Sequence, residues 1–431
     1  MPDPSPPPVA ATLFAYQVGF GDCFLLRFTY PDGARRHVLI DFGTTGLPLE
    51  AAKDQMRRVA EDIADKCGGS LDVVVATHRH ADHISGFATG DGTASGDIIA
   101  RLKPRVVVQP WTEAVDAPEQ WLGPEPEADR RAFAARRQSL AAMQDTARQA
   151  AEAAGQKRIG KFTAVAERMR FIGEDNIANV SAVSNLATMG ARNVFIFHGC
   201  DPGLGEELPG IEVVVLGPPT LRQTDTIRKQ RSRSQDEFWH LAPLRFAESA
   251  GIDDTDKLFP DAETHPASKL IAEQRWVAER IDQANAEMML GIVTALDKQM
   301  NNTSAILLFK AGSKSLLFPG DAQLENWAFA LQSPLAPLLD DVDLYKVGHH
   351  GSLNATPKSM WERFARKGDA DSRGPLTSVM STRDNKHGHA EDGTEVPRSK
   401  LVRELKQRST LVDTRELPAD ALFAVVEIDL T

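Results

Sequence analysis

Short apolar runs alternate with turn residues and with stretches of helical periodicity along most of the chain. Runs rich in β-branched residues predict strands, and apolar residues repeated every third or fourth position predict helices. Helices are predicted at residues 49–66, 98–102, 322–331 and 398–408. Strands are predicted at residues 12–17, 23–28, 37–40, 71–76, 105–110, 193–197, 211–216, 304–309, 315–321, 343–347, 377–381 and 421–430. This order predicts an α/β fold with an antiparallel start and later strand–helix–strand units.

Two long stretches interrupt this pattern. Residues 111–173 are dominated by Ala, Glu, Gln and Arg, and residues 220–290 combine a basic stretch with helical segments. We interpret both as largely helical insertions in one domain spanning residues 12–431, behind a Pro-rich, disordered leader at residues 1–11. The basic stretch contains Arg228, Lys229 and Arg231. It is either a loop that contacts phosphate groups of a substrate or a solvated loop, and the sequence favours the second reading.

Polar clusters follow several of the predicted strands. The run His78-Arg79-His80-Ala81-Asp82-His83 comes directly after the apolar residues 73–76, and Asp41, Asp321 and the pair His349-His350 end other strands. Strands that align their ends at one edge would bring these clusters together. Neutral imidazole and carboxylate are ligands that Zn²⁺, Mn²⁺ and Fe prefer, and burying this many polar groups without a cation would be costly. The sequence therefore predicts a metal site.

Composition narrows the class of protein. The 431 residues carry a formal net charge of −11, which argues against a protein that coats nucleic acid through a generally basic surface. Three widely spaced cysteines fit a reducing compartment. The start has no signal-peptide pattern, and no segment approaches about 18 continuous apolar residues. We therefore expect a cytoplasmic protein that does not associate with membranes, and the sequence leaves its oligomeric state open.

The motifs resemble the metallo-β-lactamase superfamily. The resemblance is carried by Asp41, by the histidine-rich run from His78 to His83 and by Gly320-Asp321. Further motifs resemble the nuclease-like domain of ComEC-type DNA-uptake proteins, and the matching pieces together cover about half of the chain. The motifs that resemble the ComEC-type domain are Gly19-Phe20-Gly21-Asp22, Asn301-Asn302-Thr303-Ser304, Lys346-Val347-Gly348-His349-His350-Gly351-Ser352, and Asn385 followed by Gly388-His389.

The resemblance implies a four-layer αββα fold and a hydrolase that uses two divalent metal ions, Zn²⁺ or Mn²⁺. By position, His78 and His80 would hold the first ion, Asp82 and His83 the second, Asp321 would bridge them, and His349 would complete the second site. Asp22, Asp41 and Ser352 would support the ligands. The candidates for direct catalytic roles are Asp82, His350, His389 and Asn301; His389 would contact the scissile phosphate or protonate the leaving group.

One departure from the superfamily concerns the first ion. Most members have a third histidine there, whereas this chain has Asn301 or Asn302 at that place, which leaves the choice between Zn²⁺ and Mn²⁺ open. His198 is a less favoured substitute ligand.

The leading expectation is a metal-dependent phosphodiesterase, most plausibly a nuclease acting on DNA or RNA. A hydrolase of a small phosphoester, thioester or lactone is the second hypothesis. A non-enzymatic module that binds a partner and keeps a vestigial metal site is the third, and the intact ligand set argues against it.

Overall fold

The computed structural model describes residues 6–114, 179–220, 223, 301–368, 375–384, 386, 395–418 and 420–431. By its contacts the chain divides into two units, and the described residues all belong to the first, which comprises residues 1–116, 179–223 and 300–431. The second unit comprises residues 117–178 and 224–299. Most of the two expected insertions therefore lies outside the described residues.

The first sheet of the described unit has seven strands in the order β13-β1-β2-β3-β4-β5-β6. Strands β13, β1, β2 and β3 pair antiparallel, whereas β3 to β6 run parallel. The bounds are β1 (Ala10–Tyr16), β2 (Cys23–Thr29), β3 (Arg35–Phe42), β4 (Val73–Val75), β5 (Val106–Pro110), β6 (Arg192–Ile196) and β13 (Phe423–Asp429). The parallel half places the carboxyl ends of β3, β4 and β5 at one edge.

The second sheet has six strands in the order β12-β11-β10-β9-β8-β7. Here β7, β8 and β9 pair antiparallel, and β9 to β12 run parallel. The bounds are β7 (Ile211–Gly217), β8 (Ile306–Ala311), β9 (Lys314–Phe318), β10 (Leu344–Lys346), β11 (Thr377–Met380) and β12 (Thr410–Asp413). The parallel half again aligns carboxyl ends.

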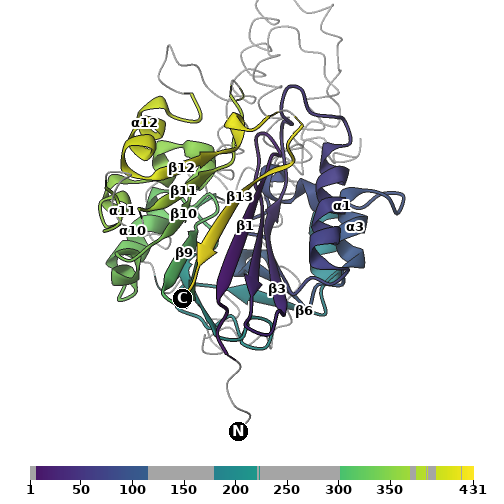
Figure 1. Ribbon diagram of the computed structural model, residues 1–431, viewed down its shortest axis with the longest axis horizontal. Helices are drawn as coiled ribbons and strands as arrows, with labels where there is room; N and C mark the ends of the chain where they lie inside the picture. Colours follow the sequence, from purple (N-terminus) through teal and green to yellow (C-terminus); the bar gives the residue numbers. More distant parts are fainter. Residues whose placement is uncertain are drawn as a thin grey trace, which may run out of the picture. The chain divides into compact units, whose positions relative to one another are not determined.

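The two sheets pack face to face through a shared apolar core (Figure 1). Phe24 of β2 and Phe318 of β9 meet there, with ring centroids 6.2 Å apart. Val73 and Val75 of β4 face this core, while Val74 between them faces the opposite side of the sheet. A strand buried on both faces needs apolar residues at every position, which explains the continuous valine run.

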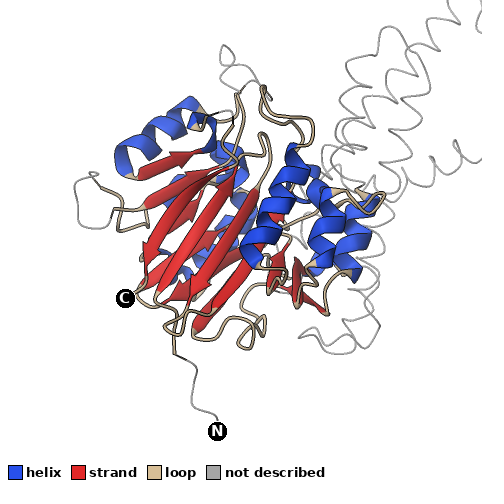
Figure 2. Cartoon of the chain, turned by 45° about the vertical axis from the view of Figure 1, so that its right-hand side comes forward, coloured by secondary structure: helices blue, strands red, loops and turns tan. Residues whose placement is uncertain are grey.

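Helices cover the outer face of each sheet (Figure 2). The first sheet packs against α1 (Gln55–Cys67), α3 (Ser95–Arg101) and α6 (Val180–Thr188). The second packs against α10 (Leu324–Gln332), α11 (Lys358–Trp361) and α12 (Ser399–Arg408). The short helix α2 (Ala81–Ile84) follows β4. Single 3₁₀ turns are η1 (Ser85–Phe87), η2 (Trp111–Glu113), η6 (Ala336–Leu339), η7 (Gly348–Gly351), η8 (Leu353–Ala355) and η9 (Thr414–Glu416).

The predicted α/β class is confirmed, and most element boundaries agree within a few residues. The first helix was expected from residue 49 but begins at Gln55, and Leu49 is 83% exposed. The helix is followed by Gly68 in the left-handed conformation, which glycine adopts readily after a helix. Strand β12 and the helices α2, α6 and α11 were not predicted. No helix among the described residues combines the length and the apolar character that a membrane crossing needs.

Candidate metal centre

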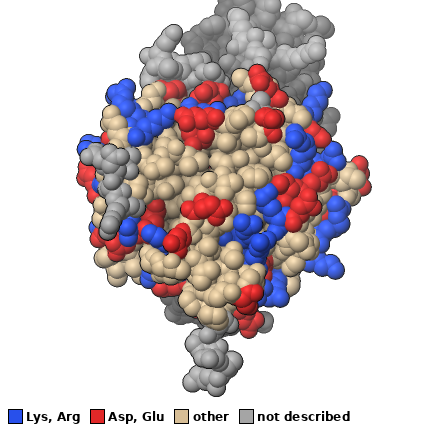
Figure 3. All heavy atoms as spheres, in the orientation of Figure 1, with Lys and Arg blue, Asp and Glu red and all other residues tan. Residues whose placement is uncertain are grey.

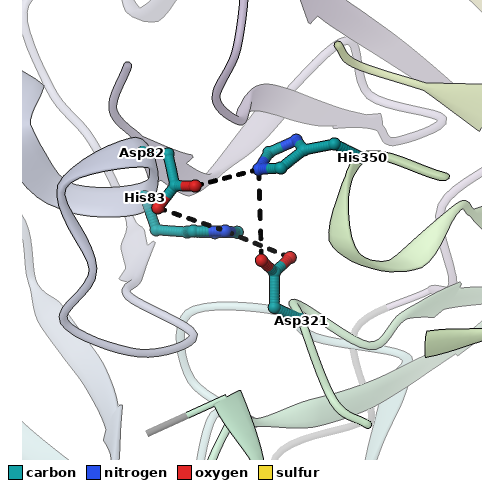
Figure 4. Close-up of side chains that lie close together, drawn as sticks. All are labelled: Asp82, His83, Asp321 and His350. Carbon is teal, nitrogen blue, oxygen red and sulfur yellow. Dashed lines mark hydrogen bonds and ion pairs between the residues drawn. The ribbon is translucent and has the colours of Figure 1, made fainter. Parts of the chain in front are cut away.

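Imidazole and carboxylate groups gather where the parallel strands of both sheets end. Three groups of residues have ligand atoms within 4.8 Å of one another. They are His78, His80 and Asp82; Asp82, His83, Asp321 and His350 (Figure 4); and Asp22, Asp41 and His83. All of these side chains are buried. Asp82 belongs to the first two groups, which are therefore neighbours that share one carboxylate, and His83 belongs to the last two.

The histidine-rich run is placed by the end of β4 and by α2. The strand ends at Val75, and the chain stays extended at His80, where φ is −61° and ψ is 149°. The single turn of α2 then places Asp82 and His83. The Nε2 atom of His78 lies 3.1 Å from Nδ1 of His80.

Asp321 and His350 come from the second sheet. Gly320, in the left-handed conformation, turns the chain after β9; a Cβ atom there would lie 2.7 Å from the Thr77 side chain. Asp321 Oδ1 lies 3.1 Å from His83 Nε2, and Asp82 Oδ2 lies 3.1 Å from His350 Nε2. The cluster therefore spans the two sheets at their common edge.

Asp41 fixes the orientation of the His83 ring. Its Oδ1 accepts a hydrogen bond from the Thr77 backbone N–H at 2.7 Å, and its Oδ2 accepts one from Thr77 Oγ1 at 2.7 Å and one from His83 Nδ1 at 2.8 Å. With Nδ1 donating to Asp41, Nε2 is the ring nitrogen that faces Asp321. Asp41 adopts a left-handed φ of 55°, which Asp tolerates better than most residues.

A buried ion pair lies behind the cluster. The Lys346 ammonium contacts the Asp22 carboxylate, donates to the Gly320 carbonyl at 3.2 Å and lies 3.6 Å from Asp321 Oδ1. Asp22 also lies 3.6 Å from Nδ1 of both His83 and His350. Lys346 is 2% exposed, so its positive charge is part of the site. Sequence analysis did not predict that Lys346 contributes its charge to the site. The signal that could have indicated this was a lysine in an otherwise apolar strand.

The electrostatics of the cluster are dominated by burial and by contacts between opposite charges. Burial opposes ionisation of Asp321, but His83, His349 and His350 outweigh it and hold the pKa of Asp321 well below its usual range. Burial likewise opposes protonation of His83, yet Asp321 and Asp41 raise the pKa of His83 well above its ordinary value. For His78, burial and the neighbouring His83 and His80 lower the pKa. The lowered pKa of His78 favours its neutral imidazole, which is the form that can bind a cation.

Two carboxylate oxygens in the cluster fit a cation. Within the described part of the chain, Asp82 Oδ1 and Asp321 Oδ2 are buried and make no hydrogen bond. A buried acceptor without a donor costs about 1–3 kcal/mol, and more when it is charged. The two oxygens lie among imidazole nitrogens, which is the donor set that Zn²⁺ and Mn²⁺ take. The residues present therefore fit a bound divalent cation.

The His349-His350 pair differs from the expectation. His349 was expected to be the ligand, but His350 joins the buried group, while the side chain of His349 is 27% exposed with Nε2 3.7 Å from Asp321 Oδ2. Both residues have left-handed φ values, 44° and 52°, and this turn directs the second ring inward. His350 Nδ1 then donates to the Ser381 carbonyl at 3.0 Å. His350, expected in a catalytic role, thus takes the position of a ligand.

The other residues expected in the site differ in whether they belong to the ligand groups. The expected bridge was Asp321, whereas the carboxylate common to the first two groups is Asp82. Asn301 is buried, and half-buried Ser352 donates its backbone N–H to the His349 carbonyl. His198 belongs to none of the groups; its Nδ1 donates to the Leu216 carbonyl at 2.8 Å. His389, Arg228, Lys229 and Arg231 lie outside the described residues.

Two residues beside the cluster belong to motifs named from the sequence but were given no role there. The Phe20 ring packs on His350, with centroids 4.3 Å apart. Arg79, between the two histidines of the first group, forms an ion pair with Glu113 at 2.5 Å.

Comparison of the sequence with protein-family models and with curated proteins finds no match.

Proposed function

We propose that this chain is a metal-dependent hydrolase of the metallo-β-lactamase superfamily, with the four-layer αββα fold. The support is the pair of sheets packed face to face with helices on each outer face, together with the histidine-rich run at the end of β4. The observation that carries the proposal is the pair of adjacent ligand groups that share Asp82.

Each group would hold one divalent cation, Zn²⁺ or Mn²⁺. His78, His80 and Asp82 would hold the first, and Asp82, His83, Asp321 and His350 the second. When bound, a pair of such ions acidifies water and neutralises the charge that develops on an attacked phosphoryl group. The chain contributes rigid ligands, because the rings of His83 and His350 are fixed through Nδ1 by Asp41 and by the Ser381 carbonyl.

A phosphodiester is the substrate that the surroundings of the site support best. Phe20 forms an isolated bridge with Gly46, and a Cβ atom on Gly46 would lie 3.2 Å from Arg383 Nη1 and 3.4 Å from Lys386 Cδ. Arg383 and Lys386 therefore lie close to Gly46, which is the bridge partner of Phe20, the residue that packs on His350. On the face shown in Figure 3, acidic and basic side chains are interspersed among the described residues, so attraction of a polyanion would be local to the site.

The test is a comparison of metallated and metal-free protein. The full chain is stripped with a chelator, reloaded with Mn²⁺ or Zn²⁺, and assayed with bis-p-nitrophenyl phosphate and with single-stranded and duplex DNA and RNA. We expect cleavage that depends on the metal and is lost in Asp82→Asn and Asp321→Asn. Fully metallated protein that cleaves none of the nucleic acids would contradict the nuclease proposal. Hydrolysis of bis-p-nitrophenyl phosphate alone would favour the hydrolase of a small phosphoester in the second hypothesis.

A further inference from the structure

Arg79 lies between two ligands of the first group, His78 and His80. Successive side chains of an extended segment point to opposite sides, and the chain is extended at His80. The two histidines accordingly share one side, where Nε2 of His78 lies 3.1 Å from Nδ1 of His80. Arg79 takes the other side, where it meets Glu113. Any shift of Arg79 would therefore move both ligands.

The side chain of Arg79 is held by a nearly buried carboxylate. Arg79 Nε donates to Glu113 Oε2 at 2.6 Å, and the exposed fractions of the two side chains are only 10% and 8%. Glu113 ends the 3₁₀ turn η2, and Trp111 of the same turn donates its Nε1 to the Pro219 carbonyl at 3.1 Å. The turn that carries Glu113 is thus tied to the chain that follows β7, which gives the guanidinium a fixed partner.

The backbone of Arg79 is held by a different residue. Asn179 Nδ2 donates to the Arg79 carbonyl at 3.1 Å, and Asn179 directly precedes α6. Asn185 of α6 donates in turn to the Phe87 carbonyl at 2.8 Å, in the 3₁₀ turn that follows α2. Two residues from separate parts of the chain therefore hold the side chain and the carbonyl of Arg79.

We propose that Glu113 and Asn179 are positioning residues for the first cation. Through Arg79 they keep His78 and His80 in place before the ion binds. This inference rests on the proposed metal centre, and neither residue belongs to the motifs that resemble the metallo-β-lactamase superfamily.

The reason lies in where the contacts are made. A buried ion pair is weak evidence for stability, because apolar residues of the same volume often serve as well. Ligands that are already held lose less freedom on binding, so contacts beside them raise the affinity for the ion. Glu113 also neutralises the Arg79 guanidinium, whose charge would otherwise repel a divalent cation. Both effects predict weaker binding when Glu113 loses its charge.

The experiment measures the two ions separately. The full chain is stripped with a chelator and titrated with Mn²⁺, and the electron paramagnetic resonance signal of the free ion reports how much remains unbound. We expect two ions on the wild-type protein, and in Glu113→Gln and Asn179→Gly one of them should bind about tenfold more weakly. The other ion should bind as in the wild type.

The Asn179→Gly variant separates position from charge. Asn179 has a left-handed φ of 31°, which glycine adopts readily, so the backbone is not strained by the change. The substitution removes the hydrogen bond to the Arg79 carbonyl and alters no charge. Weaker binding in this variant therefore reports displaced ligands.

Glu207→Gln is the matched control for Glu113→Gln. The Glu207 carboxylate pairs with Arg192 Nη2 at 3.1 Å, its side chain is 7% exposed, and it belongs to none of the ligand groups. The same substitution in an equally buried acidic residue should leave both ions bound as in the wild type. Circular dichroism verifies the fold of each variant.

Two further readouts assign the effect to the first ion. The visible absorption of Co²⁺-loaded protein depends on the arrangement of the ligands, so it should change in Glu113→Gln and stay unchanged in Glu207→Gln. In a His80→Gln background, which lacks a ligand of the first ion, Glu113→Gln should cause no additional loss of binding.

Several results would overturn the assignment. Wild-type affinity for both ions in folded Glu113→Gln or folded Asn179→Gly would remove that residue from it. Equal weakening of the two ions, an equal loss in Glu207→Gln, or an additional loss in the His80→Gln background would show that the contacts do not act on the first ion. Wild-type protein that binds no ion would instead overturn the proposed metal centre as a whole.

Discussion

Replacing Asp41 by Asn tests whether this buried carboxylate orients a metal ligand. Asp41 accepts three hydrogen bonds of 2.7–2.8 Å, two from Thr77 and one from His83 Nδ1. Asn keeps the shape and tolerates the left-handed backbone, but one of its two terminal groups is a donor. If the Asn oxygen stays on the Thr77 backbone N–H, the NH₂ group faces His83 Nδ1, which can then only accept. The proton moves to Nε2 and removes the lone pair that faces the cation.

The size of the effect follows from the position of Asp41 behind a ligand. Loss of such a partner typically weakens metal binding about 10- to 100-fold, which corresponds to about 1.4–2.7 kcal/mol. Isothermal titration calorimetry of chelator-stripped protein with Zn²⁺ measures this change, and circular dichroism verifies the fold. Asp62→Asn is the control, because the Asp62 carboxylate accepts hydrogen bonds from Tyr16 of β1 and Lys66 of α1 and belongs to none of the ligand groups. A folded Asp41→Asn variant with wild-type affinity would refute the reasoning.

Three further predictions concern the ligand choice, the pH dependence of stability and the core. His350→Gln should lose at least about tenfold in metal affinity while His349→Gln retains it, since only His350 lies in the buried group; equal losses in calorimetry would contradict this. Burial lowers the pKa of His37 from 6.5 to about 4, so the unfolded chain takes up a proton first, and stability falls by at most about 3 kcal/mol as pH drops through that window. Urea unfolding should show a shallower pH dependence in His37→Gln, and an unchanged slope would count against it. Phe24→Ala should cost about 3–5 kcal/mol in urea unfolding, because Phe24 is 1% exposed between the sheets; a loss below about 1 kcal/mol would argue against this core.

The sequence was sufficient for most of the strands because their signal is local. Val73, Val74 and Val75 form a short β-branched run that ends at polar residues, and the pattern needs no tertiary information. Strand β12 was missed because Thr410–Asp413 follows α12 directly, without turn residues to separate the two. Its place beside β11 is fixed by tertiary pairing.

The details of the site depend on conformation that sequence patterns do not encode. Which of His349 and His350 turns inward is decided by two consecutive left-handed residues. The pairing of Lys346 with Asp22 joins residues more than 300 positions apart in sequence, at the ends of strands from different sheets.

Metal content of the purified, reloaded protein tests the central claim most directly. Inductively coupled plasma mass spectrometry after removal of loosely bound ions should find two equivalents of Mn²⁺ or Zn²⁺ per chain. Asp82 is shared by the two ligand groups, so Asp82→Asn should lower the occupancy of both positions, whereas Asp321→Asn should lower only one. Folded wild-type protein that retains no divalent metal, or an Asp82→Asn variant that retains both ions, would contradict the account.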